Sequence, residues 1–303
     1  MSGAPIKVIV ELAVGDGPSQ VSLAEADVIV GFASDAGVTS IRLRDRVGEH
    51  LAIDPSVVAA HLAGKYGDIG WVIDAPTTHN APYNLARRVL SLDRATGGQA
   101  GVVLLAGVGD EVSDAAVPDP DATDPAERWS EYARVLTQLW ESFPAAALVG
   151  DQENALVADD GLIRPIDFDG RFYRVAGPLD GPSSVQGRPI LITAEPSEIG
   201  WARVSSVADA VIVDHEEIDG AVVELEAAVH AASRRRDEIA LLARVGGAAA
   251  IPAHGVDGIV LAVDGGAPEI LSAIRALKTE GSFGRRGTLR AELQLPAPEG
   301  VLA

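Results

Sequence analysis

Eight short apolar segments recur along the chain, and most are followed by a segment in which apolar residues have helical spacing. Nearly continuous apolar runs are typical of strands that are buried on both faces of a parallel sheet. The repeated alternation predicts an α/β fold, a (β/α)8 TIM-type barrel, with a doubly wound parallel sheet as the alternative. The eight predicted strands span residues 7–14, 39–43, 69–73, 100–106, 189–194, 209–213, 239–245 and 257–263.

Two connections depart from the regular alternation. Residues 143–188 form a long excursion before the fifth predicted strand, which we interpret as an insertion. Residues 246–255, between the seventh and eighth strands, are glycine-rich and too short for an ordinary helix, so either that helix is lost or the strand count is wrong by one. We expect residues 1–303 to form one barrel domain, with a C-terminal tail at 281–303.

Charge and composition exclude several classes of function. The net charge is -20 and the sequence pI is about 4.6, and so acidic a surface repels nucleic acid and anionic membranes. The chain has no cysteine, which excludes disulfides and thiolate metal sites, and its histidines have no metal-binding spacing. No apolar run reaches the ~20 residues of a membrane helix, so we expect a soluble cytoplasmic protein.

The fifth predicted strand leads directly into the start of a helix. Pro196 and Ser197 occupy its first positions, and Glu198 lies in its first turn. Free backbone N–H groups and the positive end of the helix dipole bind anions, most simply a phosphate. The alternative interpretation is that Ser197 only caps the helix.

Several segments carry a family resemblance, and they occur in order along the chain. They are PYNLARRVLSLDRATGGQAG (82–101), LWESF (139–143), GRFYRVAGPLDGPSSVQGRPILI (170–192), Ser197–Gly200 and TLRAEL (288–293). Together they resemble the luciferase-like flavin monooxygenases, in particular the branch with nitrilotriacetate and dibenzothiophene-sulfone monooxygenases.

The resemblance implies a TIM barrel that binds FMN at the C-terminal ends of its strands. Reduced FMN and O2 would then oxygenate a small organic substrate, and the flavin would carry the chemistry while the protein orients the reactants. A separate NAD(P)H:flavin reductase would supply the reduced flavin. By analogy with the family, we expect a homodimer.

The resemblance also implies flavin contacts. Ser197 matches a serine near the FMN phosphate, and Gly200 lets the helix approach closely. Thr77 and Thr78, after the third predicted strand, match small hydroxyl residues beside the flavin ring, although two ordinary turn threonines are an equal alternative. Tyr83 matches a position near the flavin, or it packs as the first aromatic residue of its helix.

Two histidines are candidates for acid/base chemistry. A family histidine is replaced here by Ala81, and His79, two residues earlier, is the candidate substitute. His215 follows the sixth predicted strand, with acidic residues on either side, so it would lie on the catalytic face of a barrel. A solvated loop histidine is the alternative for His79.

Two departures from the family pattern leave a second function open. The fourth predicted strand is apolar, with Val103 at a position where the family has a polar side chain, so ring atoms would lack hydrogen-bond partners there. Glu195 stands beside the expected phosphate and repels it. The alternative is a flavin-poor or non-catalytic barrel that acts as a binding protein or partner subunit.

Overall fold

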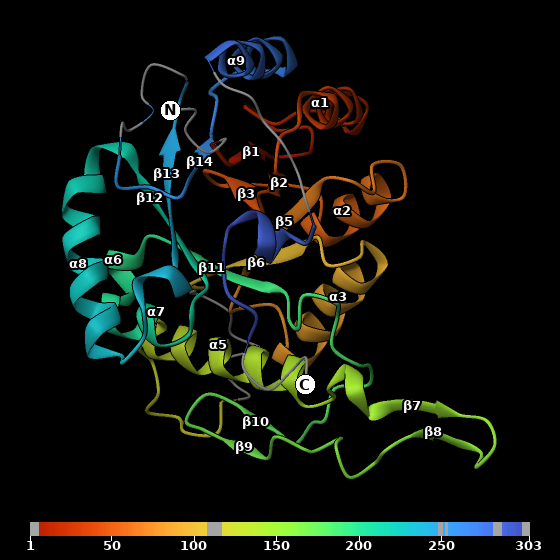
Figure 1. The fold of residues 1–303 in the computed structure, drawn as a ribbon. Helices are drawn as coiled ribbons and strands as arrows, with labels where there is room; N and C mark the ends of the chain where they lie inside the picture. The colour runs from red at the N-terminus through yellow and green to blue at the C-terminus, as the bar shows by residue number, and fades with distance from the viewer. Residues whose placement is uncertain (1–5, 108–116, 248–250, 252–253, 281–286, 299–303) are drawn as a thin grey trace.

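The computed structural model describes residues 6–107, 117–247, 251, 254–280 and 287–298. Eight parallel strands close into a barrel surrounded by helices (Figure 1), which confirms the (β/α)8 fold. Val8 on the first strand pairs with Ile259 on the last, so the sheet has no open edge and the doubly wound alternative is wrong. The strands are β1 (Val8–Leu12), β2 (Ser40–Leu43), β5 (Gly70–Pro76), β6 (Ala100–Leu105), β11 (Ile190–Ala194), β12 (Ala210–Asp214), β13 (Ala240–Val245) and β14 (Gly258–Leu261).

The apolar strand sequences follow from burial on both faces. Alternate side chains, such as those of Ile9, Val72 and Val103, fill the barrel interior, and their sequence neighbours pack under the helices. The helices are α1 (Leu23–Ala36), α2 (Pro55–Ala63), α3 (Pro82–Ala95), α5 (Pro125–Glu141), α6 (Pro196–Ile199), α7 (Trp201–Val207), α8 (Ile218–Ala231) and α9 (Ala267–Glu280).

Local capping sets several helix starts. Ser22 and Glu25 form a reciprocal capping box, so α1 begins at Leu23. Asp54 and Asp124 cap α2 and α5, each of which has proline at its first position. Within the described residues, no helix is both long and apolar enough to cross a membrane.

The two irregular connections are present as expected. Between β13 and β14, the described part of residues 246–257 includes no helix. The insertion before β11 contains a short 3-10 helix (Ala145–Ala147) and two hairpins, β7 (Leu148–Asp151) with β8 (Leu156–Ala158), and β9 (Phe168–Asp169) with β10 (Arg174–Val175). A third small hairpin, β3 (Arg46–Val47) with β4 (His50–Leu51), follows β2.

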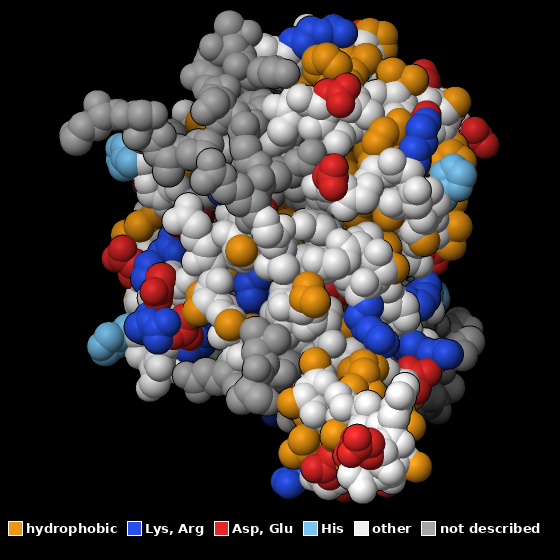
Figure 2. Space-filling model, turned by 45° about the vertical axis from the view of Figure 1, so that its right-hand side comes forward, with side chains coloured by type: hydrophobic (Ala, Val, Ile, Leu, Met, Phe, Trp, Pro, Cys, Tyr) orange, Lys and Arg blue, Asp and Glu red, His pale blue; other side chains and the backbone are white. Residues whose placement is uncertain are grey.

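The β7–β8 hairpin projects away from the barrel (Figure 1). Its apolar side chains are largely in solvent, and Val157 is 74% exposed. Figure 2, which brings this side forward, shows hydrophobic side chains beside acidic ones on the projection at the lower edge.

The chain returns after α9 to close the base of the barrel. Leu289, at the start of α10 (Leu289–Glu292), joins Leu293 and Leu295 in the interior apolar cluster, so this segment plugs the N-terminal end of the barrel. Glu292 pairs with Lys7 at 2.6 Å, which fastens the plug to the entry of β1.

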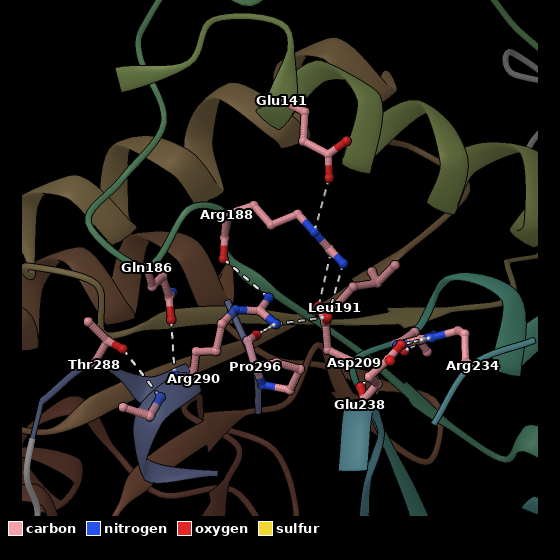
Figure 3. A network of polar contacts seen from close by, with 12 residues as sticks. Glu141, Gln186, Arg188, Leu191, Asp209, Arg234, Glu238, Thr288, Arg290 and Pro296 are labelled. Atoms are coloured by element: carbon pink, nitrogen blue, oxygen red, sulfur yellow. Dashed lines mark hydrogen bonds and ion pairs between the residues drawn. The ribbon is translucent and has the colours of Figure 1, made fainter. Parts of the chain in front are cut away.

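An ion-pair network holds the base together (Figure 3). Asp209, just before β12, accepts hydrogen bonds at 3.0 Å from both Nη atoms of Arg188 and at 3.1 Å from Nη1 of Arg290. Gln186 donates to Asp93 and to the carbonyl of Ala100, and it accepts from the backbone N–H of Arg290. The QGRP and TLRAEL segments therefore stabilise the barrel base, at the end opposite the usual active site.

Candidate active site

A charged layer lies above the apolar interior at the C-terminal end of the barrel, where TIM-barrel active sites are built. Side chains two positions apart on a strand share a face. Ile9, Val72 and Leu242 face the barrel interior. Glu11, Asp74 and Arg244 lie two positions further along the same strands, so their side chains face the interior as well. Arg42 of β2 pairs in register with Glu11. We name Glu11, Arg42, Asp74 and Arg244 the mouth cluster.

Arg42 is the centre of the mouth cluster. Its Nη1 donates to Glu11 Oε2 at 2.9 Å, and its Nε and Nη2 donate to the two carboxylate oxygens of Asp74 at 2.8 and 3.0 Å. Nη2 of Arg244 reaches Glu11 Oε1 at 3.0 Å from the other side. Arg44, after β2, also donates to Glu11 at 3.0 Å.

Three members of the mouth cluster are buried, and Arg244 is partly exposed. Glu11, Arg42 and Asp74 are all less than 9% exposed. Burial alone would raise the pKa of Glu11, but the guanidinium groups of Arg42 and Arg244 lower it to about 2. Burial opposes the charge of Arg42, yet Asp74 and Glu11 raise the pKa of Arg42 above its ordinary value. Burial raises the pKa of Asp74 above its ordinary value, against the lowering effect of Arg42.

The cluster leaves little space at the barrel mouth. The cavity above it measures about 150 Å³. Pockets that hold small organic ligands commonly measure about 300–1,000 Å³. Three arginines and three carboxylates line it: Arg42, Arg44, Arg244, Glu195, Asp214 and Glu217.

Thr77 and Thr78 are buried and serve the packing of the strand ends. Thr77 Oγ1 accepts a hydrogen bond from the backbone N–H of Gly107 at 3.0 Å, and the hydroxyl of Tyr173 donates to the Thr77 carbonyl at 3.2 Å. A Cβ at Gly107 would lie 2.2 Å from Thr78 Oγ1, so only glycine allows this approach. The two threonines lock β5 to β6.

Tyr83 and His79 lie beyond the same strand end. Tyr83 is partly buried and packs against the main apolar core, which agrees with the interpretation that it packs as the first aromatic residue of its helix. His79 is exposed and has a positive φ of 59°, and Ala81 is exposed at the start of α3. Neither His79 nor Tyr83 lines the mouth cavity.

The predicted phosphate position differs from an ordinary helix start. α6 has only four residues, and its N-cap is Glu195, at φ 60°, without a side-chain cap. Ser197 is exposed at the second helical position, so the interpretation of Ser197 as the cap is wrong. Gly200, at φ 96°, separates α6 from α7. Glu195 lines the mouth cavity and raises the pKa of Arg42.

His215 stands apart from the mouth cluster. It is partly exposed after β12, and its Nδ1 lies 2.9 Å from Glu216 Oε2. It does not line the cavity, whereas the preceding residue, Asp214, pairs with Arg244 Nη1 at 3.3 Å. The structure therefore does not bring His79 and His215 together with the polar groups of the mouth. Across the described ranges, no set of three His, Cys, Asp or Glu side chains is placed to hold a metal.

The mouth cluster was not predicted from the sequence, although a signal for it exists. Each of four apolar strands is interrupted by one charge on its interior face, as in VIVEL, SIRL, GWVIDAP and ALLARV. Because a lone buried charge is costly, two acids and two bases at such positions indicate mutual pairing.

The residues present do not fit the FMN that the resemblance implies. The mouth cluster leaves a cavity of about 150 Å³, below the ~300–1,000 Å³ usual for pockets that hold small organic ligands. On β6 and β11 the interior positions Val103, Leu105 and Ala194 carry no polar side-chain atom for the ring edge. Glu195 is the N-cap of the helix at the predicted phosphate position, and it lines the mouth cavity.

The chain is similar to several known proteins. A family model described as luciferase-like monooxygenase matches residues 8–256. A subunit of pristinamycin IIA synthase from Streptomyces pristinaespiralis is 29% identical over 273 residues, 89% of this chain and 88% of that protein. Nitrilotriacetate monooxygenase component A of Aminobacter aminovorans is 31% identical over 161 residues, 52% of this chain but 36% of that protein. Dibenzothiophene-sulfone monooxygenase of Rhodococcus erythropolis is 28% identical over 200 residues, which cover 64% of this chain and 44% of that protein.

Two solved structures share the fold. EDTA monooxygenase from Chelativorans sp. BNC1 superposes with a TM-score of 0.75 at 18% identity, covering 97% of this chain and 99% of the other. A long-chain alkane monooxygenase superposes with a TM-score of 0.79 at 17% identity, covering 96% of both chains.

Proposed function

The chain belongs to the luciferase-like monooxygenase family, and from this membership we propose that it takes part in the FMN-dependent oxygenation of a small organic substrate. The observation that carries the proposal is the extent of the family match, which runs from β1 to the residues just before β14. A match that spans seven of the eight barrel strands is stronger support than a match to one motif. Reduced FMN and O2 would supply the oxygenating chemistry.

The proposal includes a second protein that reduces the flavin. The part of the chain that the structure describes consists of one barrel and its hairpins, with no second nucleotide-binding domain. By analogy with the family, a separate NAD(P)H:flavin reductase would provide reduced FMN, and its need for NAD(P)H favours a cytoplasmic location. The substrate stays at the level of a small organic molecule, because relatives are named for compounds as different as nitrilotriacetate and dibenzothiophene sulfone.

Assembly with another barrel is also part of the proposal. A homodimer is the expectation from the family. The relative that matches this chain over nearly its whole length is named as one subunit of a synthase, which favours a partner chain instead. Light scattering of the purified protein distinguishes a homodimer from a monomer that needs a partner.

The roles predicted for Ser197, Gly200, Thr77, Thr78 and Tyr83 as FMN contacts belong to one version of this function, in which the chain itself holds the flavin. His79 and His215 as acid/base groups belong to the same version. The position of Thr77 and Thr78 directly after β5, at the C-terminal end of the barrel, favours it.

Labelling with isotopic O2 tests the proposal without a known substrate. A strain of the source organism that lacks the chain is compared with the same strain complemented by it. We expect at least one small organic product that gains an oxygen atom from O2 only when the chain is present. Identical sets of labelled products in the two strains would refute the function.

A further inference from the structure

We infer that this barrel does not hold the flavin and that the chain is the partner subunit of a flavin-holding barrel of the same family. The inference rests on the proposed oxygenation function and assigns this chain a place in it. The mouth cluster stands at the C-terminal end of the barrel interior, in the volume that a bound ring would need.

Charged side chains occupy the mouth of the barrel. Four strands each direct a charged side chain into the mouth, where Glu11, Arg42 and Asp74 are buried and the partly exposed Arg244 contacts Glu11. Glu11 alone receives hydrogen bonds from Arg42, Arg44 and Arg244. What remains is a cavity of about 150 Å³, about half the lower end of the usual ~300–1,000 Å³ range for ligand pockets.

Displacing the charged side chains from the mouth would cost free energy. A ring could enter only by displacing Arg42, and Arg42 supplies all the hydrogen bonds that the structure shows for the carboxylate of Asp74. Asp74 is 4% exposed, so its displaced charge would stay buried with only the more distant Arg44, whose Nε lies 4.0 Å from Asp74 Oδ2. The cluster therefore cannot be opened one residue at a time.

Neither the polar ring edge nor the phosphate of FMN has suitable partners in this barrel. The polar edge of the ring needs hydrogen-bond partners, but the interior side chains of β6, Val103 and Leu105, are apolar. The phosphate needs free N–H groups without a nearby anion, but the N-cap of the four-residue α6 is Glu195. Both ends of the cofactor would lose interactions at the same time.

Titration of FMN fluorescence tests the inference on the wild-type chain and on two matched variants. The opened variant combines Glu11→Ala, Arg42→Ala and Asp74→Ala, which removes the charges and the volume. The filled variant combines Glu11→Gln, Arg42→Met and Asp74→Asn, which removes the charges but keeps the volume. Circular dichroism and cooperative melting show which variants are folded.

We expect no saturable fluorescence change for the wild type or the filled variant at micromolar protein. The opened variant should gain at least about tenfold in affinity for FMN over the wild type. Saturable binding of FMN to the wild type would overturn the inference, and this result does not depend on the variants. A folded opened variant with no gain would also overturn it, because the cluster would then not be what excludes the ring.

The outcome is separable from that of the proposed function. Wild-type FMN binding together with labelled oxygenation products would keep the function and reject the subunit role. Absence of FMN binding together with loss of labelled products in the deletion strain supports both.

Discussion

Asp93 allows a quantitative test of the base of the barrel. Its side chain is fully buried in α3 and accepts hydrogen bonds from Ala100 N–H at 2.8 Å, from Gln186 Nε2 at 2.6 Å and from the hydroxyl of Ser184. Burial raises the pKa of Asp93 to about 6, against the lowering effect of these donors. Asparagine can keep all three contacts, because its Oδ1 accepts from Ala100 and Gln186 while its Nδ2 donates to Ser184.

The direction of the pH effect follows from the raised pKa. Below the ordinary value of 3.8, Asp93 is protonated in both the folded and the unfolded chain and costs nothing. As the pH rises from 3.8 to about 6, the unfolded chain ionises first and the folded state loses stability. The full loss is about 3 kcal/mol, from about two pKa units at 1.36 kcal/mol each. About half of this loss of stability occurs between about pH 5 and 7.5, and both of these pH values lie above the pI.

Urea denaturation of the wild type and the Asp93→Asn variant at the two pH values measures this term. The variant cannot titrate at this position, so its stability relative to the wild type should rise by about 1.5 kcal/mol between about pH 5 and 7.5. Other titrating groups cancel in the difference. Glu226→Gln, at an exposed position on α8, is the control and should run parallel to the wild type. A pH-independent difference for Asp93→Asn would refute the reasoning.

Three further predictions concern the mouth cluster and the plug. Arg42→Met should cost about 3–5 kcal/mol because it leaves Asp74 buried without its donors, and adding Asp74→Asn should recover part of that loss in a double-mutant cycle; additive losses would contradict the pairing. The pKa of Glu11 is lowered from 4.5 to about 2, so its ionised form stabilises the fold above pH 4.5 and this stabilisation is lost as the pH falls to about 2. The free energy of unfolding of the wild type, relative to that of Glu11→Gln, should therefore fall by about 3 kcal/mol over this range. An unchanged advantage in acid denaturation would show that Glu11 is not held by the arginines. Leu293→Ala should lower the free energy of unfolding by about 2–5 kcal/mol, measured in urea, and a loss below about 0.5 kcal/mol would show that the C-terminal segment does not plug the barrel.

The barrel was predictable because its strands are buried on both faces. Runs such as residues 100–105 are apolar at every position, and this pattern does not depend on distant contacts. Helix ends were less well predicted, since a cap depends on one local geometry. Apolar spacing alone predicts helices over residues 19–36 and 218–236, whereas α1 begins at Leu23, because Ser22 caps it, and α8 ends at Ala231.

The candidate site was harder to predict, because its members come from strands far apart in sequence. Glu11 and Arg244 form an ion pair across 233 positions of chain. Each of them is one charge in an apolar strand, and only closure of the barrel brings them together. Both charges lie at interior-facing positions of their strands, and this shared placement was the signal available in the sequence.

The segments that reveal the family bear on the fold more than on the chemistry. Gln186 and Arg290, in QGRP and TLRAEL, fasten the C-terminal plug to the base. They lie at the end of the barrel opposite the mouth, so they do not report on what binds there. The apolar β6 and Glu195, which depart from the family pattern, lie at the mouth itself.

Equilibrium dialysis of the purified wild-type chain against FMN tests most directly whether the mouth cluster replaces the flavin. We predict equal FMN concentrations on the two sides of the membrane, for oxidised FMN and, without oxygen, for reduced FMN. An excess on the protein side that approaches one FMN per chain would contradict the subunit role and would show that the mouth cluster opens for the cofactor.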